Sequence, residues 1–174
     1  VLHRTFEAFA GVHVPTVVCN EIVSRAPAEE RNVEFYNLSD MAVDLSGFHL
    51  TLTPLQPDLF TFPDGSWISP RDFLLLTEAD LGFSLVARDE MVSLFLYDPD
   101  GKKVLDAVRL LEPSDLAAEV QAHARMPDGG AWSVTPTPTP GLANQVDFET
   151  RVVINEIHFN PRLADNQFKP LDDT

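Results

Sequence analysis

The sequence predicts an all-β protein, an antiparallel sandwich or barrel. Three observations support this fold class. Apolar and β-branched residues are concentrated in short runs that recur about every ten residues, as in β-sandwiches. Turn-forming pairs such as Asp-Gly and Ser-Pro separate these runs. Helical patterns do not alternate with the runs, so a parallel sheet with crossover helices is not expected. We expect about eight or nine strands.

The first part of the chain contains three strand patterns, at residues 16–23, 33–37 and 43–53. The first is rich in β-branched residues, and the second ends at a cluster of turn-forming residues. In the third pattern, apolar residues alternate up to Gly47 and change phase after it. A glycine at such a phase change predicts a bulge or a sharp bend within the strand pattern.

The middle of the chain continues in the same way. Short apolar runs at residues 59–62 and 67–68 flank a turn. Residues 73–77 are an apolar run closed by a threonine, which predicts a strand buried on both faces. Residues 91–97 and 103–111 flank the sequence Asp-Pro-Asp-Gly, so we expect a hairpin whose glycine, Gly101, adopts a positive φ.

The last part of the predicted module is less regular. Residues 114–121 predict one short helix, with Ser114 as its N-cap. Residues 135–141 alternate Thr and Pro before a glycine, and proline lacks the N–H that a strand ladder needs. We therefore expect an extended exit segment there. Trp67 and Trp132 are the largest candidates to fill the core.

One segment occurs almost twice. Residues 17–22 recur at residues 152–157 with five of six residues identical. A repeat separated by about one domain length predicts tandem modules. We therefore expect an N-terminal flank at 1–14, one complete sandwich at 15–144, and a linker with the truncated start of a second copy at 145–174.

Composition excludes several classes of partner. The chain has 12 basic and 27 acidic residues, a net charge of −15. Such a surface repels nucleic acids and anionic lipids, and no apolar run is long enough for a transmembrane span. Cys19 is the single cysteine, so no intrachain disulfide is possible, and its apolar surroundings predict that it is buried.

Several motifs, in this order and spacing, resemble the lamin-tail domain in its bacterial form. They include VCNEI at 18–22, VDLSGFHL at 43–50, RMPDG at 125–129 and TPGLAN at 139–144, and the resemblance extends over residues 15–144. It implies an immunoglobulin-like antiparallel β-sandwich. It also implies an accessory domain of secreted or surface bacterial proteins, with no catalytic residues to carry over.

The resemblance favours a non-catalytic accessory, interaction or spacer module of a larger secreted or surface bacterial protein. We expect an extracellular or cell-surface location, no cofactor, and no enzymatic activity. The expected partners are other domains of the parent protein, or a protein or surface ligand. Nucleic acid binding and membrane insertion are not expected, and the oligomeric state is left open.

Two alternatives remain open. Asp98 and Asp100 resemble the start of a calcium loop, but position twelve of that loop is Arg109 rather than a glutamate. Weak Ca²⁺ binding for adhesion or stabilisation would use these acids, or Glu21 and Glu34. The second alternative is an enzyme in which Glu21 and Glu34 lie close together in a cleft and perform acid/base catalysis. Recurrence of Asn-Glu in the second copy instead favours a structural role.

Overall fold

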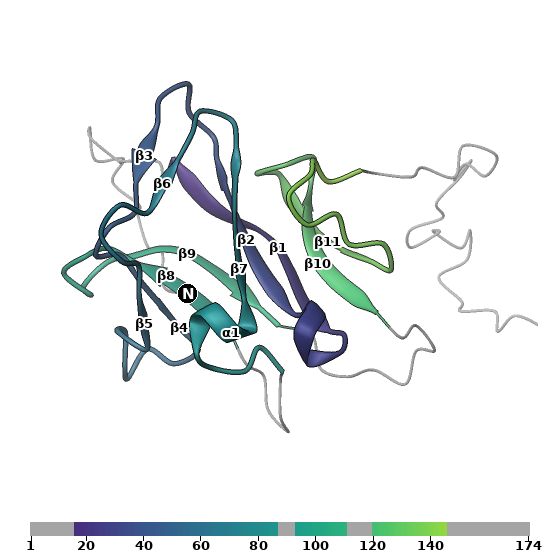
Figure 1. Cartoon of the computed structure of the whole chain (residues 1–174), viewed down its shortest axis with the longest axis horizontal. Helices are drawn as coiled ribbons and strands as arrows, with labels where there is room; N and C mark the ends of the chain where they lie inside the picture. The colour runs from purple at the N-terminus through teal and green to yellow at the C-terminus, as the bar shows by residue number, and fades with distance from the viewer. Residues whose placement is uncertain (1–15, 87–92, 111–119, 146–174) are drawn as a thin grey trace, which may run out of the picture.

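The computed structural model describes residues 16–86, 93–110 and 120–145 (Figure 1). Within these ranges the chain forms eleven strands, and every strand pairing is antiparallel. The all-β prediction is confirmed. The elements in chain order are β1 (Val17–Arg25), the 3-10 helix η1 (Ala28–Glu30), β2 (Asn32–Asn37), β3 (Val43–Asp44), β4 (His49–Thr51), β5 (Phe60–Thr61), β6 (Trp67–Ile68), β7 (Phe73–Thr77), α1 (Glu78–Leu81), β8 (Ser93–Tyr97), β9 (Val104–Arg109), β10 (Gln121–Met126) and β11 (Ala131–Thr135).

Two larger sheets pack as a sandwich, with a small ribbon beside them (Figure 1). The first sheet has the order β11-β10-β1-β2-β7 and the second the order β5-β4-β8-β9. Ile22 and Phe35 of the first sheet share one apolar core with Leu50 and Leu94 of the second. Because alternate residues of a strand face opposite sides, this core fixes which side chains of β1 and β2 face outward.

The predicted strand at residues 43–53 is two strands. Gly47 does not form a bulge; its φ of +79° lies in the turn between β3 and β4. The Gly47 N–H donates to the carbonyl of Phe62 at 2.9 Å, which anchors this turn. β3 then pairs with β6 in the ribbon, whereas β4 pairs with β5 and β8 in the second sheet.

Three further predictions need correction. Among the described strands, β7 pairs only with β2 and forms an edge of the first sheet. Leu75 is exposed, so the strand is not buried on both faces. Trp67 is 58 % exposed on the ribbon and does not fill the core, whereas Trp132 packs against the core. The helix predicted at 114–121 lies mostly outside the described residues, and Gln121 begins β10 instead.

The hairpin prediction is confirmed. β8 and β9 are joined by the turn at 98–101, in which the φ of Gly101 is +64°. The second copy predicted from residue 152 lies outside the described residues. Among the helices of the described ranges, none has the length and apolar character needed to cross a membrane.

Candidate functional site

Asn20 and Glu21 of β1 and Glu34 of β2 lie together on the outer face of the first sheet. In the ladder between these strands, Cys19 pairs with Phe35. The next pair joins Glu21 to Glu34, so Asn20 is an extra residue, a β-bulge. Since Cys19 and Phe35 belong to the core, the two glutamates face away from it.

Residues 136–145, here called the closing segment, cover this outer face. The backbone N–H of Thr139 donates to both carboxylate oxygens of Glu21, at 3.1 and 2.9 Å. The N–H of Gly141 donates to Oε2 of Glu34. Both glutamates are 0 % exposed. The segment joins no strand ladder, as predicted, but it packs back on β1 and β2 rather than leading away from them.

The side chain of Asn20 connects Glu34 to the turn between β10 and β11. Its Nδ2 donates to Oε1 of Glu34 at 3.0 Å and to Oδ1 of Asp128 at 2.9 Å. Its Oδ1 accepts the N–H of Gly129 at 3.0 Å. The N–H of Asn144 donates to Oδ1 of Asp128 at 3.0 Å. The amide of Asn20 and the carboxylate of Asp128 thus join β1, the turn between β10 and β11, and the closing segment.

Asn144 fixes the end of the closing segment. Its Nδ2 donates to the carbonyls of Asn20 and Arg125, at 3.3 and 3.0 Å. Its Oδ1 accepts the hydroxyl of Thr139 at 2.8 Å. Each polar atom of this buried side chain therefore has a partner, as a stable buried amide requires.

The electrostatics of the glutamate pair are unusual because no cation among the described residues forms an ion pair with it. Burial is the main reason that the pKa of Glu21 is raised from 4.5 to about 7, and the charges of Glu34 and Asp128 raise it further. The N–H of Thr139 acts in the opposite direction. Burial also raises the pKa of Glu34, against its hydrogen bonds. Neither glutamate forms an ion pair within the described residues.

A separate ion pair links the two sheets. The guanidinium of Arg125 on β10 contacts both oxygens of Asp106 on β9, at 2.9 and 3.1 Å. Asp106 accepts the N–H of Cys19 at 2.9 Å, and Arg125 Nε donates to the Cys19 carbonyl at 2.8 Å. Arg125 also lies 4.5 Å from the ring centre of Trp132. Polar contacts therefore hold the sheets together where other sandwiches use a disulfide.

A model of the Lamin Tail Domain family matches residues 13–111, more than half of the chain. The chain belongs to the lamin-tail domain family. This family is generally a non-catalytic structural module. No curated protein and no solved structure matches the chain significantly.

Important parts of this lamin-tail domain lie beyond the matched residues. β10 follows residue 111 yet pairs with β1 in the first sheet, and the closing segment covers the glutamates from still further along the chain. The match does not include the second copy predicted at residue 152. The boundaries at 14–15 and 144–145, and the second copy itself, stay predictions.

The proposed calcium ligands do not form one site. Asp98 accepts the backbone N–H groups of Lys102 and Lys103 at 2.9 and 3.1 Å, which lowers its pKa and stabilises the hairpin. It therefore acts as a turn residue in the second sheet, remote in the topology from the glutamates of the first. In the part of the chain that the structure describes, no cluster of three His, Cys, Asp or Glu residues has metal-binding geometry.

Sequence reasoning singled out Glu21 and Glu34, and its enzyme alternative required them to lie close together in a cleft. The strand register places them side by side, but they lie beneath the closing segment rather than in a cleft. Sequence reasoning treated Asp128 only as a turn-forming residue and assigned no role to Thr139 or Asn144. A signal for these residues was present, because they belong to the RMPDG and TPGLAN motifs that carried the family resemblance. The missing information was that both motifs contact the Asn-Glu motif.

Gly129 provides a stability test of the turn that contacts Asn20. We expect Gly129→Ala to lower the free energy of unfolding by about 2 kcal/mol, because its φ is +72° and an added Cβ would clash with the side chain of Leu38. Gly65→Ala is the control, because its φ of +85° is equally strained but no atom lies within 4 Å of the added Cβ. Urea denaturation should show a loss of about 1 kcal/mol for the control. Equal losses would contradict the steric part of the prediction.

Proposed function

We propose that this chain is a non-catalytic accessory module of a larger secreted or surface bacterial protein. Its task is rigid display or spacing: the sandwich presents its loops and separates neighbouring domains. The observation that carries the proposal is the burial of Glu21 and Glu34, the acids best placed for chemistry, beneath a segment of their own chain.

The hydrogen bonds of these acids support a structural role. A general acid or base must come within hydrogen-bond reach of its substrate, either directly or through one water molecule. Glu21 and Glu34 have no exposed surface, and their oxygens accept N–H groups from Asn20, Thr139 and Gly141. A substrate would reach them only if the closing segment left its place. The generally non-catalytic family agrees with this interpretation.

The arrangement also suits a spacer. β1 begins the described part of the domain, and residues 136–145 end it. The network of Asn20, Asp128 and Asn144 ties these two ends together through long-range contacts. A module whose first strand and last segment are joined in this way resists extension from either end, which is useful between domains.

The test replaces residues 15–144 in the parent protein with an unrelated disulfide-free β-sandwich of similar length. A spacer predicts that the activities of the neighbouring domains, and their display on intact cells, are retained. Loss of surface attachment or of partner binding would instead assign a specific interaction role to this module.

Protease accessibility on intact cells tests the proposed location. Protection of a folded, expressed module inside the cell would contradict a secreted or surface location.

A calcium titration addresses the alternative of Ca²⁺-dependent stabilisation. We expect the melting temperature to be the same in millimolar Ca²⁺ and in EDTA, because Oδ1 of Asp98 already accepts hydrogen bonds from the backbone N–H groups of Lys102 and Lys103. Asp98→Asn and Asp100→Asn variants provide the matched comparison. A rise of several degrees with Ca²⁺ in the parent chain, absent from these variants, would restore the calcium hypothesis.

A further inference from the structure

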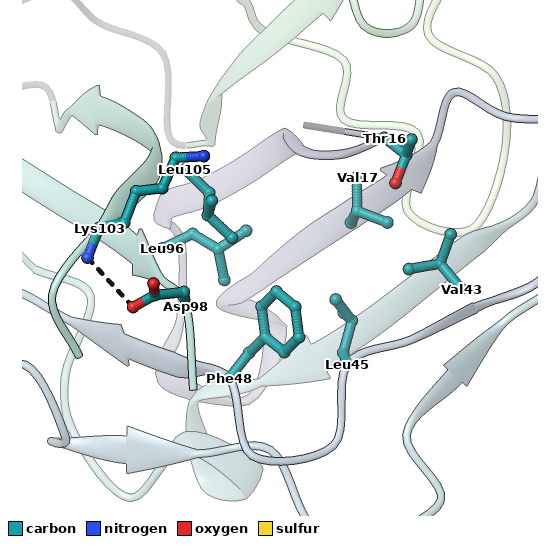
Figure 2. Close-up of a pocket in the computed structure, with 9 residues that line it drawn as sticks. All are labelled: Thr16, Val17, Val43, Leu45, Phe48, Leu96, Asp98, Lys103 and Leu105. Carbon is teal, nitrogen blue, oxygen red and sulfur yellow. Dashed lines mark hydrogen bonds between the residues drawn. The ribbon is translucent and has the colours of Figure 1, made fainter. Parts of the chain in front are cut away.

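An apolar pocket opens between the sheets near the start of β1. Its volume is about 270 Å³. Figure 2 shows apolar side chains from both sheets and from the β3–β4 turn converging on one space. The nine lining residues are labelled in Figure 2.

The walls and the rim of this pocket differ chemically. Six of the nine lining side chains are aliphatic or aromatic, and the polar ones are Thr16, Asp98 and Lys103. An apolar site with a small number of polar groups at defined positions is the usual form of a small-molecule pocket. Asp98 and Lys103 lie together at one end, and Thr16 lies across the pocket from them (Figure 2). An occupant should therefore have an apolar body and one polar end.

The rim carries one acid, Asp98, and one base, Lys103, and the base is the group that can receive an anionic end. Oδ1 of Asp98 accepts two backbone N–H groups, so this carboxylate already has hydrogen-bond partners within the hairpin. The ammonium of Lys103 is exposed and forms no ion pair within the described residues. It is the charged donor at the rim that remains available to a ligand.

The volume of the pocket limits the size of the ligand's apolar part. Ligand pockets generally measure about 300 to 1,000 Å³, and this one lies just below that range. A two-chain lipid is too large, whereas a single unbranched chain is small enough for this volume. We propose that this pocket binds a single-chain acyl carboxylate, with its chain between the sheets and its carboxylate at Lys103.

Calorimetric titration of the full 174-residue chain tests this proposal with three probes of known chemistry. Decanoate is expected to bind, and octanoate, which is two methylenes shorter, to bind about fifteenfold more weakly, since each buried methylene contributes roughly fourfold to affinity. Decyltrimethylammonium, which has the same chain and the opposite charge, is expected to bind more weakly than decanoate. Absence of decanoate binding below its micellar concentration, or stronger binding of the cationic probe, would overturn the proposal.

Two variants locate the site. Val43→Phe adds bulk to a half-buried wall position and should abolish decanoate binding while the protein remains folded by circular dichroism. Lys103→Glu should weaken decanoate binding about fivefold. Lys102→Glu is the matched control, because it makes the same charge change at an exposed neighbour that does not line the pocket. Equal effects of the two lysine variants would show that only net charge matters and would overturn the assigned headgroup position.

Discussion

Raising the pH from about 5 to about 9 should lower the free energy of unfolding by about 3 kcal/mol through Glu21 alone. The pKa of Glu21 is about 7 in the folded protein, compared with 4.5 for an ordinary glutamate. Below pH 4.5 the side chain is protonated in both states, so its contribution to stability is fully present. Between the two values the folded state binds more protons than the unfolded state, so stability falls as the pH rises. Above about pH 7 the folded state also holds a buried negative charge.

Urea denaturation of the parent chain and of Glu21→Gln, at both ends of this pH range, measures the effect. The substituted amide carries no charge at either pH, so the variant should lose about 3 kcal/mol less than the parent chain. Other groups titrate in the same range, including His123, whose pKa is lowered by burial and which acts in the opposite direction. Groups that do not interact with Glu21 behave alike in both proteins and largely cancel in the comparison, whereas Glu34, whose charge raises the pKa of Glu21, does not cancel fully. Parallel pH profiles would contradict the raised pKa of Glu21.

The fold class was predictable because it depends on local patterns. Short apolar runs separated by turns are sufficient to indicate an antiparallel sandwich, and the Asp-Pro-Asp-Gly turn indicates its own hairpin. Errors arose where one local pattern permits two structures. The phase change at Gly47 is compatible with a bulge or with a turn, and only pairing of β3 and β4 with different partners decides between them.

The site was less predictable because it depends on contacts distant in sequence. The bulge at Asn20 has no glycine or proline to mark it, yet it places Asn20 and Glu21 together on the outer face. The segment that covers them begins more than 100 residues later, as the separation of 118 between Thr139 and Glu21 shows. No periodicity in the sequence reports such a contact. The recurring Asn-Glu pair therefore indicated a structural role, but it did not indicate which segment of the chain the pair contacts.

Truncation of Asn20 tests the network most directly. We expect Asn20→Ala to lower the free energy of unfolding by about 4 kcal/mol. The variant loses the two donors that reach Glu34 and Asp128 and the acceptor of the Gly129 N–H. It also leaves two acids near each other without the amide between them. Urea denaturation at neutral pH measures the loss.

A matched control separates this effect from that of losing an amide in general. Gln56→Ala removes an exposed amide and should change the free energy of unfolding by less than about 0.5 kcal/mol. If Asn20→Ala were equally mild, the hydrogen bonds of Asn20 would contribute nothing net. The closing segment would then be held mainly by the backbone N–H groups that reach Glu21 and Glu34.

Asn20→Asp distinguishes lost hydrogen bonds from lost volume, because it keeps the shape of the side chain and removes its donors. At neutral pH it would add a third acid beside Glu34 and Asp128, so it should destabilise the protein more than Asn20→Ala. At about pH 4, where protonation returns a donor, it should be the milder of the two. This reversal of order follows only if Asn20 acts as the donor between Glu34 and Asp128. A structural role limited to filling space predicts the same order at every pH.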